Sequence, residues 1–264
     1  MQHIKNLILD MDGVLWIGET PMPGLVELFE RMREREIGIM LATNNASKTA
    51  VQYTQKLAKF GVTIGPEAIL TAALATAEYL SRRYEAGTTA YVAGGLGLHQ
   101  ALRDKGFHLL TVEEAYAGAN AEFIAVGFHP EITYPELAAG ALLVQRGAEF
   151  IGSNPDTTYP SEYGLLPGAG SLIAVVATAT GVKPTIIGKP GPIIYEEAVR
   201  RLGGTLANTA MVGDRLDTDV KGAAAVGLNT ILVMSGIAQP DDLAQSDLKP
   251  DYVLADIGEL TGLL

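Results

Sequence analysis

The stretch LILDMDGVLW, residues Leu7–Trp16, decides how the chain can fold. It opens with three aliphatic residues, a run that favours a buried strand. Asp10 and Asp12 follow the run directly, one residue apart. Because side chains alternate along a strand, both carboxylates are expected to point the same way from its carboxyl end. An ionised carboxylate is rarely buried without a partner, so the pair predicts either a local turn or a chemical site.

The composition narrows the class of protein. A chain of 264 residues, 48% of them hydrophobic, can form one large domain or two modest ones with a packed core. It contains no cysteine, which excludes disulfides, zinc thiolates and thiol nucleophiles. No apolar run approaches the roughly 18 residues that a membrane span needs, and the first residues lack the regions of a signal peptide. We therefore expect a cytoplasmic protein with no membrane partner.

The charge balance limits the partners. The net charge of −11 argues against nucleic acid, because phosphate contacts along a nucleic acid need clustered Lys and Arg. A small phosphorylated metabolite remains compatible, since a few local cations or a metal ion can hold it.

Strand-like apolar runs alternate with amphipathic helical segments through most of the chain. In the N-terminal and C-terminal parts, strands are expected over 7–10, 37–42, 68–70, 185–187, 210–212 and 230–233, and helices over 24–36, 47–60, 192–202 and 217–226. Such alternation is typical of a parallel sheet covered by helices on both faces. The fold class is therefore predicted as α/β, a doubly wound, Rossmann-like parallel sheet.

The middle of the chain differs in the segments that connect its predicted strands. Strands are expected over 90–93, 123–126 and 150–151, but the segments 127–130 and 154–170 between them hold Pro and Gly. We predict a core domain formed by 1–72 and 183–264, with a smaller α/β domain, 73–182, inserted into it.

Polar side chains follow the other core strands as well. Thr43, Asn44 and Asn45 follow the second strand, and Lys189 follows the strand at 185–187 as a cation without a partner nearby in the sequence. Each has an ordinary structural explanation when taken singly: a helix cap, a turn or a solvated surface charge. Those explanations do not say why every core strand should end in a polar group of a different kind.

Acidic residues dominate this edge of the predicted sheet. Asp214 follows the strand at 210–212 and Asp219 lies five residues further on, so four carboxylates, with Asp10 and Asp12, are expected at one rim. Four carboxylates together would repel one another or force protonation. A divalent cation resolves that conflict, and oxygen ligands alone favour Mg²⁺.

The four segments resemble, in order and spacing, the signature motifs of the haloacid dehalogenase-like phosphatases. The motifs are Asp10-x-Asp12-Gly13-Val14, Thr43-Asn44-Asn45, Gly188-Lys189-Pro190 and Gly213-Asp214-Arg215-x-x-Thr218-Asp219. The large insert, with Asn154-Pro155-Asp156 and Pro167–Ser171, resembles the cap of subfamily IIA. That subgroup contains nucleotide, 4-nitrophenyl-phosphate, pyridoxal-phosphate and phosphoglycolate phosphatases.

The resemblance implies a role for each aspartate. Asp10 would attack phosphorus and form an aspartyl-phosphate, which splits one difficult hydrolysis into two easier steps. Asp12 would protonate the leaving oxygen and later deprotonate the incoming water. Mg²⁺ would be held by Asp10, the backbone carbonyl of Asp12 and Asp214, with Asp219 orienting a metal-bound water.

The resemblance also implies how the phosphate is held. Thr43 and the amide of Asn44, with Asn45 beside it, would bind the phosphoryl oxygens. Lys189 would offset negative charge on the phosphate and on Asp10.

Two further segments are expected near the substrate. Trp16 is interpreted either as part of a small flap over 15–23 that excludes water or as a half-buried packing residue. In the insert, Thr157, Thr158 and Tyr159 lie where the subgroup reads its substrate, although a plain surface loop explains them too. The exposed surface of the insert adds a homodimer through the cap to the expectations.

Other functions fit the residues less well. A non-catalytic phosphoacceptor domain is about half this length and places its nucleophile on a later strand. Hydrolysis of a carbon–halogen bond needs neither a metal nor an acid two residues after the nucleophile. A dinucleotide-binding oxidoreductase needs a Gly-x-Gly-x-x-Gly turn after the first strand, where this chain has none. A phosphotransferase or phosphomutase stays open beside the predicted phosphatase, whose substrate would be a nucleotide, a sugar phosphate or a similar monoester.

Overall fold

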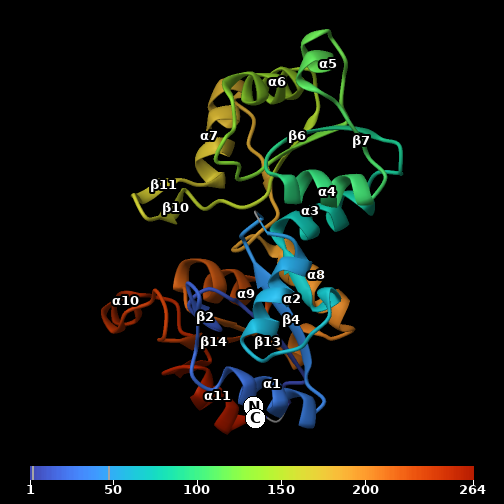
Figure 1. The fold of residues 1–264 in the computed structure, drawn as a ribbon. Helices are drawn as coiled ribbons and strands as arrows, with labels where there is room; N and C mark the ends of the chain where they lie inside the picture. Colours follow the sequence, from blue (N-terminus) through green and yellow to red (C-terminus); the bar gives the residue numbers. More distant parts are fainter. Residues whose placement is uncertain (2, 47) are drawn as a thin grey trace. The chain divides into compact units, whose positions relative to one another are not determined.

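The computed structural model describes residues 1, 3–46 and 48–264, and the chain divides into two compact units (Figure 1). The first unit comprises Met1–Thr43, Ala50–Leu70 and Lys189–Leu264. The second comprises Asn44–Thr49 and Thr71–Gly188, so it is inserted into the chain of the first.

The first unit is built on a six-stranded sheet with the order β15-β14-β13-β1-β4-β5. Its strands are β1 (Asn6–Leu9), β4 (Gly38–Thr43), β5 (Ile69–Thr71), β13 (Thr209–Gly213), β14 (Asn229–Val233) and β15 (Tyr252–Leu254). β1 pairs in parallel with β4 on one side and β13 on the other, and the parallel pairing continues through β14 to β15. The strand order reverses at β1, and ligands of open α/β sheets bind at such a switch point, beyond the carboxyl ends of the strands.

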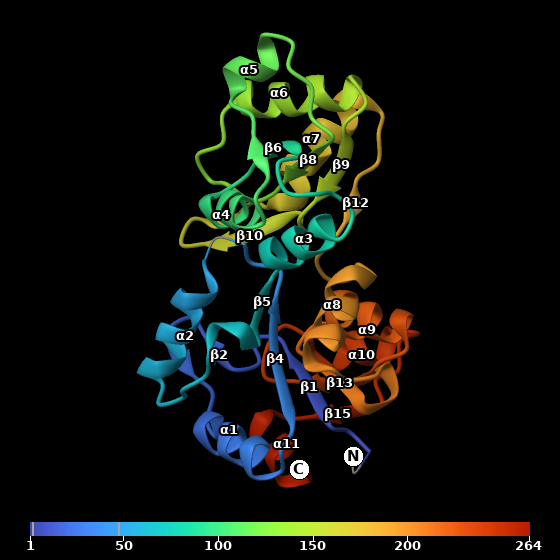
Figure 2. The same ribbon diagram turned by 90° about the vertical axis from the view of Figure 1, so that its right-hand side faces the viewer.

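Helices cover both faces of this sheet (Figure 2). The helices are α1 (Leu25–Glu34), α2 (Ala50–Lys59), α8 (Pro192–Leu202), α9 (Lys221–Val226), α10 (Pro240–Gln245) and α11 (Ile257–Leu263). Leu7 and Leu9 of β1 pack in one cluster with residues of α1, α2 and α11. Ile8, between them, is equally buried but lies outside that cluster, as the alternation of a strand requires. The aliphatic run of β1 is thus explained by burial on both faces.

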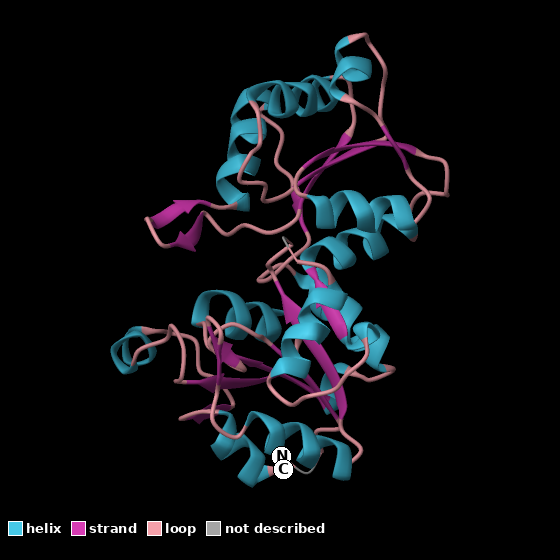
Figure 3. Cartoon of the chain, viewed as in Figure 1, coloured by secondary structure: helices cyan, strands magenta, loops and turns pink. Residues whose placement is uncertain are grey.

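The second unit has a five-stranded parallel sheet with the order β12-β9-β8-β6-β7. Its strands are β6 (Thr89–Ala93), β7 (His108–Leu109), β8 (Phe123–Val126), β9 (Glu149–Gly152) and β12 (Thr185–Ile186). Its helices are α3 (Ala72–Ser81), α4 (Leu96–Asp104), α5 (Val112–Tyr116), α6 (Tyr134–Gln145) and α7 (Ala169–Thr180), drawn in cyan in Figure 3. Residues of β6, β8 and β9 share one core cluster with residues of α5, α6 and α7.

Two antiparallel hairpins lie outside the sheets. The first is formed by β2 (Trp16–Ile17) and β3 (Thr20–Pro21), directly after the predicted site residues of β1. The second, β10 (Thr158–Ser161) with β11 (Gly164–Pro167), occupies part of the segment that the sequence indicates only as a linker. Pro and Gly indicated a loop here, yet Pro160 lies within β10 opposite Leu165, and Gly164 and Pro167 are the first and last residues of β11.

The predicted α/β fold is confirmed, and three details differ from the expected elements. The strand expected in the core at 185–187 is β12, which pairs with β9 in the sheet of the second unit, because the chain crosses to the first unit only at Lys189. The helix expected over 217–226 starts as one turn of π-helix, η3 (Leu216–Val220), and only then continues as α9. The amides of Asp219 and Val220 both donate to the Arg215 carbonyl there, at 3.1 and 3.2 Å. The expected start of another helix, at residue 47, lies outside the described residues; α2 begins at Ala50.

Within the described ranges, no helix combines the length and apolar character needed to cross a membrane.

Candidate active site

Asp10 directly follows β1 and lies at the carboxyl edge of the core sheet. The backbone amide of Asp10 donates to the Val212 carbonyl of β13 at 2.9 Å, so the ladder extends one residue beyond the strand. Asp10 Oδ1 accepts a hydrogen bond from the Met11 amide at 2.8 Å and lies 2.9 Å from Lys189 Nζ. The side chain is 13% exposed, so the carboxylate is fixed at the edge yet reachable.

Lys189 forms a buried ion pair with two carboxylates. Its Nζ lies 2.9 Å from Asp10 Oδ1 and 2.7 Å from Asp219 Oδ1, and its side chain is only 3% exposed. Burial lowers the pKa of this ammonium group, but the Asp10 and Asp219 carboxylates outweigh burial and raise the pKa above its usual range. The interpretation of Lys189 as a solvated surface charge is therefore wrong: its partners are Asp10, which follows β1, and Asp219 in η3, both distant in the sequence.

Asp219 is fully buried and is the second carboxylate that pairs with Lys189. Its Oδ1 accepts from Lys189 and its Oδ2 accepts from the Arg215 amide at 3.2 Å. Burial raises the pKa of Asp219 to about 7; Lys189 opposes that rise and Asp10 adds to it. The wide π-turn of η3 carries this residue, and such turns often occur at functional sites.

Asp214 is buried with one oxygen unused. Its Oδ2 accepts from the Ile237 amide at 2.8 Å, whereas its Oδ1 has no hydrogen-bond partner among the described residues. Burial and the nearby Asp10 carboxylate raise the pKa of Asp214 to about 6. A buried oxygen without a partner is costly in a protein interior, so this atom marks a place for a ligand.

The three carboxylates fit a divalent cation. Asp10, Asp214 and Asp219 each offer an oxygen, and these oxygens all lie within 4.8 Å of one another. Gly13 and Gly236 close in on Asp214 so tightly that a Cβ at either position would collide with its carboxylate. Hard oxygen donors of this kind suit Mg²⁺ or a similar cation.

Asp12 lies apart from the buried cluster. Its side chain is exposed, and its Oδ1 accepts a hydrogen bond from Trp16 Nε1 at 2.8 Å. Trp16 itself is fully buried, not half-buried, and stacks on Tyr53 with ring centroids 6.4 Å apart. Trp16 is thus the first residue of the β2–β3 hairpin, and its side chain is part of the core.

Thr43 ends β4 beside β1 and is buried. Asn44 and Asn45, which follow it, belong to the second unit and are partly buried. The Asn44 side chain donates to Asp156 Oδ2 at 3.1 Å, and the Asn154 side chain donates to the Asn44 carbonyl at 2.8 Å. These bonds tie the two Asn-containing motifs together, and the phosphate-binding role of Thr43, Asn44 and Asn45 stays a prediction.

Thr157, Thr158 and Tyr159 are exposed on the second unit, at the start of the β10–β11 hairpin. The Thr157 carbonyl accepts from the Gly168 amide and from Ser171 Oγ, at 2.9 and 2.6 Å. Those bonds fix the base of the hairpin, and the three side chains are exposed to solvent. Their contact with a substrate stays a prediction.

Sequence reasoning missed three residues that support the cluster. Ser235 Oγ donates to the Gly13 carbonyl at 2.9 Å, and the Ile237 amide holds Asp214. Both follow β14, so the rule that core strands end in functional polar groups could have found this loop. Tyr195 donates to the Thr218 carbonyl at 2.7 Å from within α8, and an aromatic residue in an amphipathic helix gave no signal of that.

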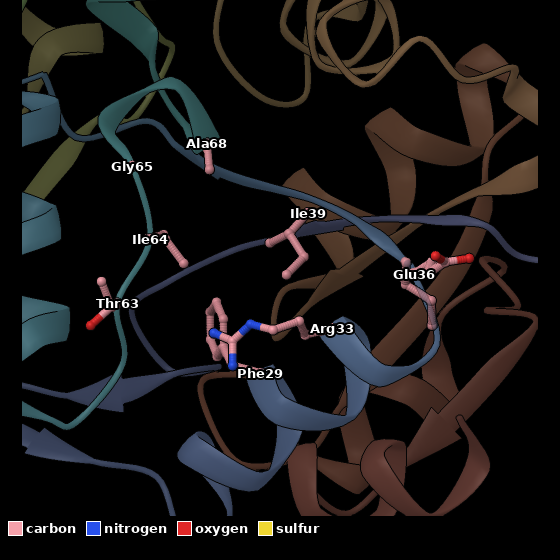
Figure 4. Close-up of a pocket in the computed structure, with 9 residues that line it drawn as sticks. Phe29, Arg33, Glu36, Ile39, Thr63, Ile64, Gly65 and Ala68 are labelled. Atoms are coloured by element: carbon pink, nitrogen blue, oxygen red, sulfur yellow. The ribbon is translucent and has the colours of Figure 1, made fainter.

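A cavity of about 370 Å³ lies elsewhere in the first unit (Figure 4). It is lined by Phe29, Arg33, Glu36, Ile37, Ile39, Thr63, Ile64, Gly65 and Ala68. None of the predicted site residues is among them, so this cavity is separate from the carboxylate cluster.

Comparison with known proteins agrees with this arrangement. Residues 7–108 match the family described as haloacid dehalogenase-like hydrolase, and residues 186–260 match the one described as HAD-hydrolase-like. An acid sugar phosphatase of Staphylococcus epidermidis is 35% identical over 97% of this chain and 96% of its own.

Solved structures are equally similar. The p-nitrophenyl phosphatase from Archaeoglobus fulgidus has a TM-score of 0.91 and 32% identity, covering 99% of both chains. NagD from E. coli K-12 has a TM-score of 0.88 and 32% identity, covering 97% of this chain and 98% of its own. The chain therefore belongs to the haloacid dehalogenase-like hydrolases, among the subfamily IIA members, and is a phosphoric monoester hydrolase.

Proposed function

We propose that the chain is a Mg²⁺-dependent phosphatase that hydrolyses a small phosphate monoester through an aspartyl-phosphate on Asp10. The observation that carries the proposal is the position of Asp10. Its carboxylate lies 2.9 Å from a buried ammonium group and beside Asp214, whose buried Oδ1 has no partner among the described residues. That setting matches a nucleophile that works next to a cation site.

Asp10, Asp214 and the backbone carbonyl of Asp12 are proposed to hold the metal ion. Both oxygens of Asp219 are already engaged, by Lys189 and by the Arg215 amide, so Asp219 is proposed to act beside the ion by holding Lys189. When bound, Mg²⁺ would supply positive charge that offsets the carboxylates and polarises a phosphoryl oxygen.

The residues of the chain carry the two chemical steps. In the first, an Asp10 oxygen bonds to phosphorus, the bond to the leaving oxygen breaks, and Asp12 gives that oxygen a proton. In the second, water attacks the same phosphorus, the bond to Asp10 breaks, and Asp12 takes the proton of the water. The sum is one ester and one water converted to one alcohol and one phosphate, with both aspartates restored.

Lys189 and Thr43 are proposed to stabilise the transferred group. The Lys189 ammonium group already faces Asp10 and would also face charge developing on the phosphoryl oxygens. Thr43, at the end of the strand next to β1, would donate its hydroxyl to one of those oxygens.

The second unit is proposed to act as the cap that selects the substrate, with domain bounds near 73–182. The displayed Thr157, Thr158 and Tyr159 support this role, since a selecting surface must be exposed. The names of the relatives, acid sugar phosphatase and p-nitrophenyl phosphatase, support a sugar phosphate or an aryl phosphate as the substrate. A homodimer through this unit is part of the same proposal.

Release of inorganic phosphate from 4-nitrophenyl phosphate and from a panel of sugar phosphates tests the proposal. Turnover is expected with added Mg²⁺ and is expected to disappear with excess chelator. Undiminished turnover in metal-free buffer would remove the metal from the mechanism. Transfer of phosphate to an added alcohol in preference to water would replace the phosphatase with a phosphotransferase.

A further inference from the structure

We propose that Trp16 is a positioning residue for proton transfer: its indole N–H holds Oδ1 of Asp12 and thereby assigns the proton to Oδ2. The inference rests on the proposed function, because it takes Asp12 as the acid and base of the reaction. It goes further by naming the oxygen that works and the group that chooses it.

The hydrogen bond between the two residues has only one possible direction. Trp16 Nε1 lies 2.8 Å from Asp12 Oδ1, and an indole nitrogen is a donor that cannot accept. Oδ1 therefore presents a lone pair to the indole whether Asp12 is ionised or protonated. In a neutral carboxyl the carbonyl oxygen is the stronger acceptor, so the bond favours the form of Asp12 with its proton on Oδ2.

The backbone brings the indole back to Asp12 through a tight turn. The Met11 carbonyl accepts from the amides of Leu15 and Trp16, at 2.8 and 3.3 Å, and the Gly13 amide donates to the Trp16 carbonyl at 2.8 Å. Gly13 has φ 84°, a backbone conformation that favours glycine. The turn thus sets the Trp16 side chain beside that of Asp12, four residues earlier.

Neighbouring side chains hold the indole in one orientation. Tyr53 stacks on it at 6.4 Å and 20°, Phe60 packs at 6.0 Å, and Lys56 Nζ lies 4.7 Å from the ring centroid. Lys56 is itself held by the Gly18 carbonyl at 2.6 Å. Trp16 is fully buried while Asp12 is exposed, so a rigid donor orients a carboxylate that would otherwise rotate in solvent.

The proton path then runs through one atom. As the bond from phosphorus to the leaving oxygen breaks, its electron pair stays on that oxygen and the Asp12 Oδ2 proton moves to it. In the second step Oδ2 takes a proton from the attacking water. Trp16 keeps its own proton throughout, which is why it positions Asp12 and does no chemistry.

Trp16→Phe tests the inference by keeping an aromatic ring against Tyr53 and Phe60 while removing the N–H. For an alkyl phosphate, whose leaving oxygen needs the proton, kcat/KM is expected to fall about tenfold or more, a part of the 10²–10⁴ that general acid catalysis supplies. For 4-nitrophenyl phosphate, whose leaving group needs little protonation, the loss is expected to be less than about twofold. Equal losses on both substrates, or no loss on either, would overturn the inference.

Phe29→Leu is the control. Phe29 lies in the same core cluster as Trp16, but the ring contacts of the indole within the described residues are with Tyr53 and Phe60. The variant is therefore expected to lower the Tm without changing the ratio of kcat/KM for the two substrates. If Trp16→Phe does not fold, Lys56→Met takes its place, because it removes the cation over the ring and the bond to Gly18. It is expected to cause a smaller loss confined to the alkyl phosphate, and an equal loss on both substrates would contradict the proposal.

A spectroscopic test is independent of activity. Trp16 is the only tryptophan in the sequence, so the ¹H–¹⁵N spectrum contains one indole signal, and it reports this bond directly. Asp12→Ala removes the acceptor and is expected to shift that signal upfield; an unchanged signal would show that the bond does not form.

The two proposals fail in different ways. If the unaltered enzyme releases no phosphate from any ester, the proposed function fails even though the indole signal responds to Asp12→Ala. If the enzyme is active and Asp12→Asn selectively impairs alkyl phosphates, but Trp16→Phe does not, only the inference about Trp16 fails.

Discussion

Lys189 Nζ lies 2.7 Å from Asp219 Oδ1, and both side chains are excluded from solvent. Removing one partner of a buried ion pair leaves the other charge without compensation, which typically costs about 3–5 kcal/mol. Lys189→Met is therefore expected to lower the free energy of unfolding by about that amount, as well as to lower kcat by roughly 10²-fold or more. Thermal melts and kinetics on the same preparation measure the two effects.

The control for Lys189 is Lys183→Met, at an exposed lysine nearby in the sequence, which should change neither quantity. The double variant Lys189→Met with Asp219→Asn should regain part of the lost stability but none of the activity, because it removes the uncompensated charge and not the catalytic defect. A Lys189→Met protein as stable as the unaltered one would show that the ion pair is not formed.

The proposed roles of Asp10 and Asp12 predict different failures. Asp10→Asn should abolish turnover, because an amide cannot form the acyl-phosphate. Asp12→Asn should still transfer phosphate from 4-nitrophenyl phosphate to Asp10, since a nitrophenolate leaves without much help from an acid. It should then stall, because no base remains to activate water, at a cost of about 10²–10⁴-fold.

Rapid mixing and acid-quenched labelling distinguish the two variants. Asp12→Asn is expected to give a burst of nitrophenol and labelled phosphate on the protein, and Asp10→Asn is expected to give neither. A burst from Asp10→Asn, or the same silence from both, would contradict the assignment of roles.

The fold could be predicted from the sequence, whereas the contacts of the site residues could be predicted only in part. The aliphatic run before Asp10 and the alternation of strands and helices were sufficient for the fold, because burial on both faces dictates such runs. The partners of Lys189 were not visible, since ion pairs between segments far apart in the chain depend on the tertiary fold and not on local sequence. The bond from Trp16 to Asp12 was missed for a related reason: a tight turn, not a strand or helix period, brings them together.

The buried aspartates predict a pH dependence of stability in the metal-free protein. The pKa of Asp214 is raised to about 6 and that of Asp219 to about 7, whereas both have ordinary values when the chain is unfolded. Between about pH 4 and pH 7 the folded state therefore binds more protons than the unfolded state, and stability falls as pH rises through that window. Mg²⁺ offsets the charge of the ionised cluster, so the rise in Tm that it causes should be larger at pH 8 than at pH 5.

Differential scanning calorimetry with and without Mg²⁺ measures this dependence. Asp214→Asn, which removes one of the ionising groups, should flatten the metal-free profile and remove most of the Mg²⁺ effect. An increase in Tm that is the same at pH 5 and pH 8 would mean that the cation binds elsewhere.

The hairpin of the second unit offers a test of substrate selection. Tyr159 is 37% exposed and stacks on Phe128 with ring centroids 4.6 Å apart, whereas Tyr163, between the two strands of the hairpin, is 84% exposed. If Tyr159 contacts the part of the substrate that does not react, Tyr159→Ala should lower kcat/KM for the preferred natural phosphate by about tenfold, because remote contacts contribute binding energy to catalysis. A small aryl phosphate, which makes fewer remote contacts, should be spared.

Tyr163→Ala is the matched control and should leave the order of substrates unchanged. Parallel losses on every substrate from Tyr159→Ala would instead assign Tyr159 to holding the hairpin on Phe128, and Tyr159→Phe, which keeps the stacking, would then restore activity on all of them.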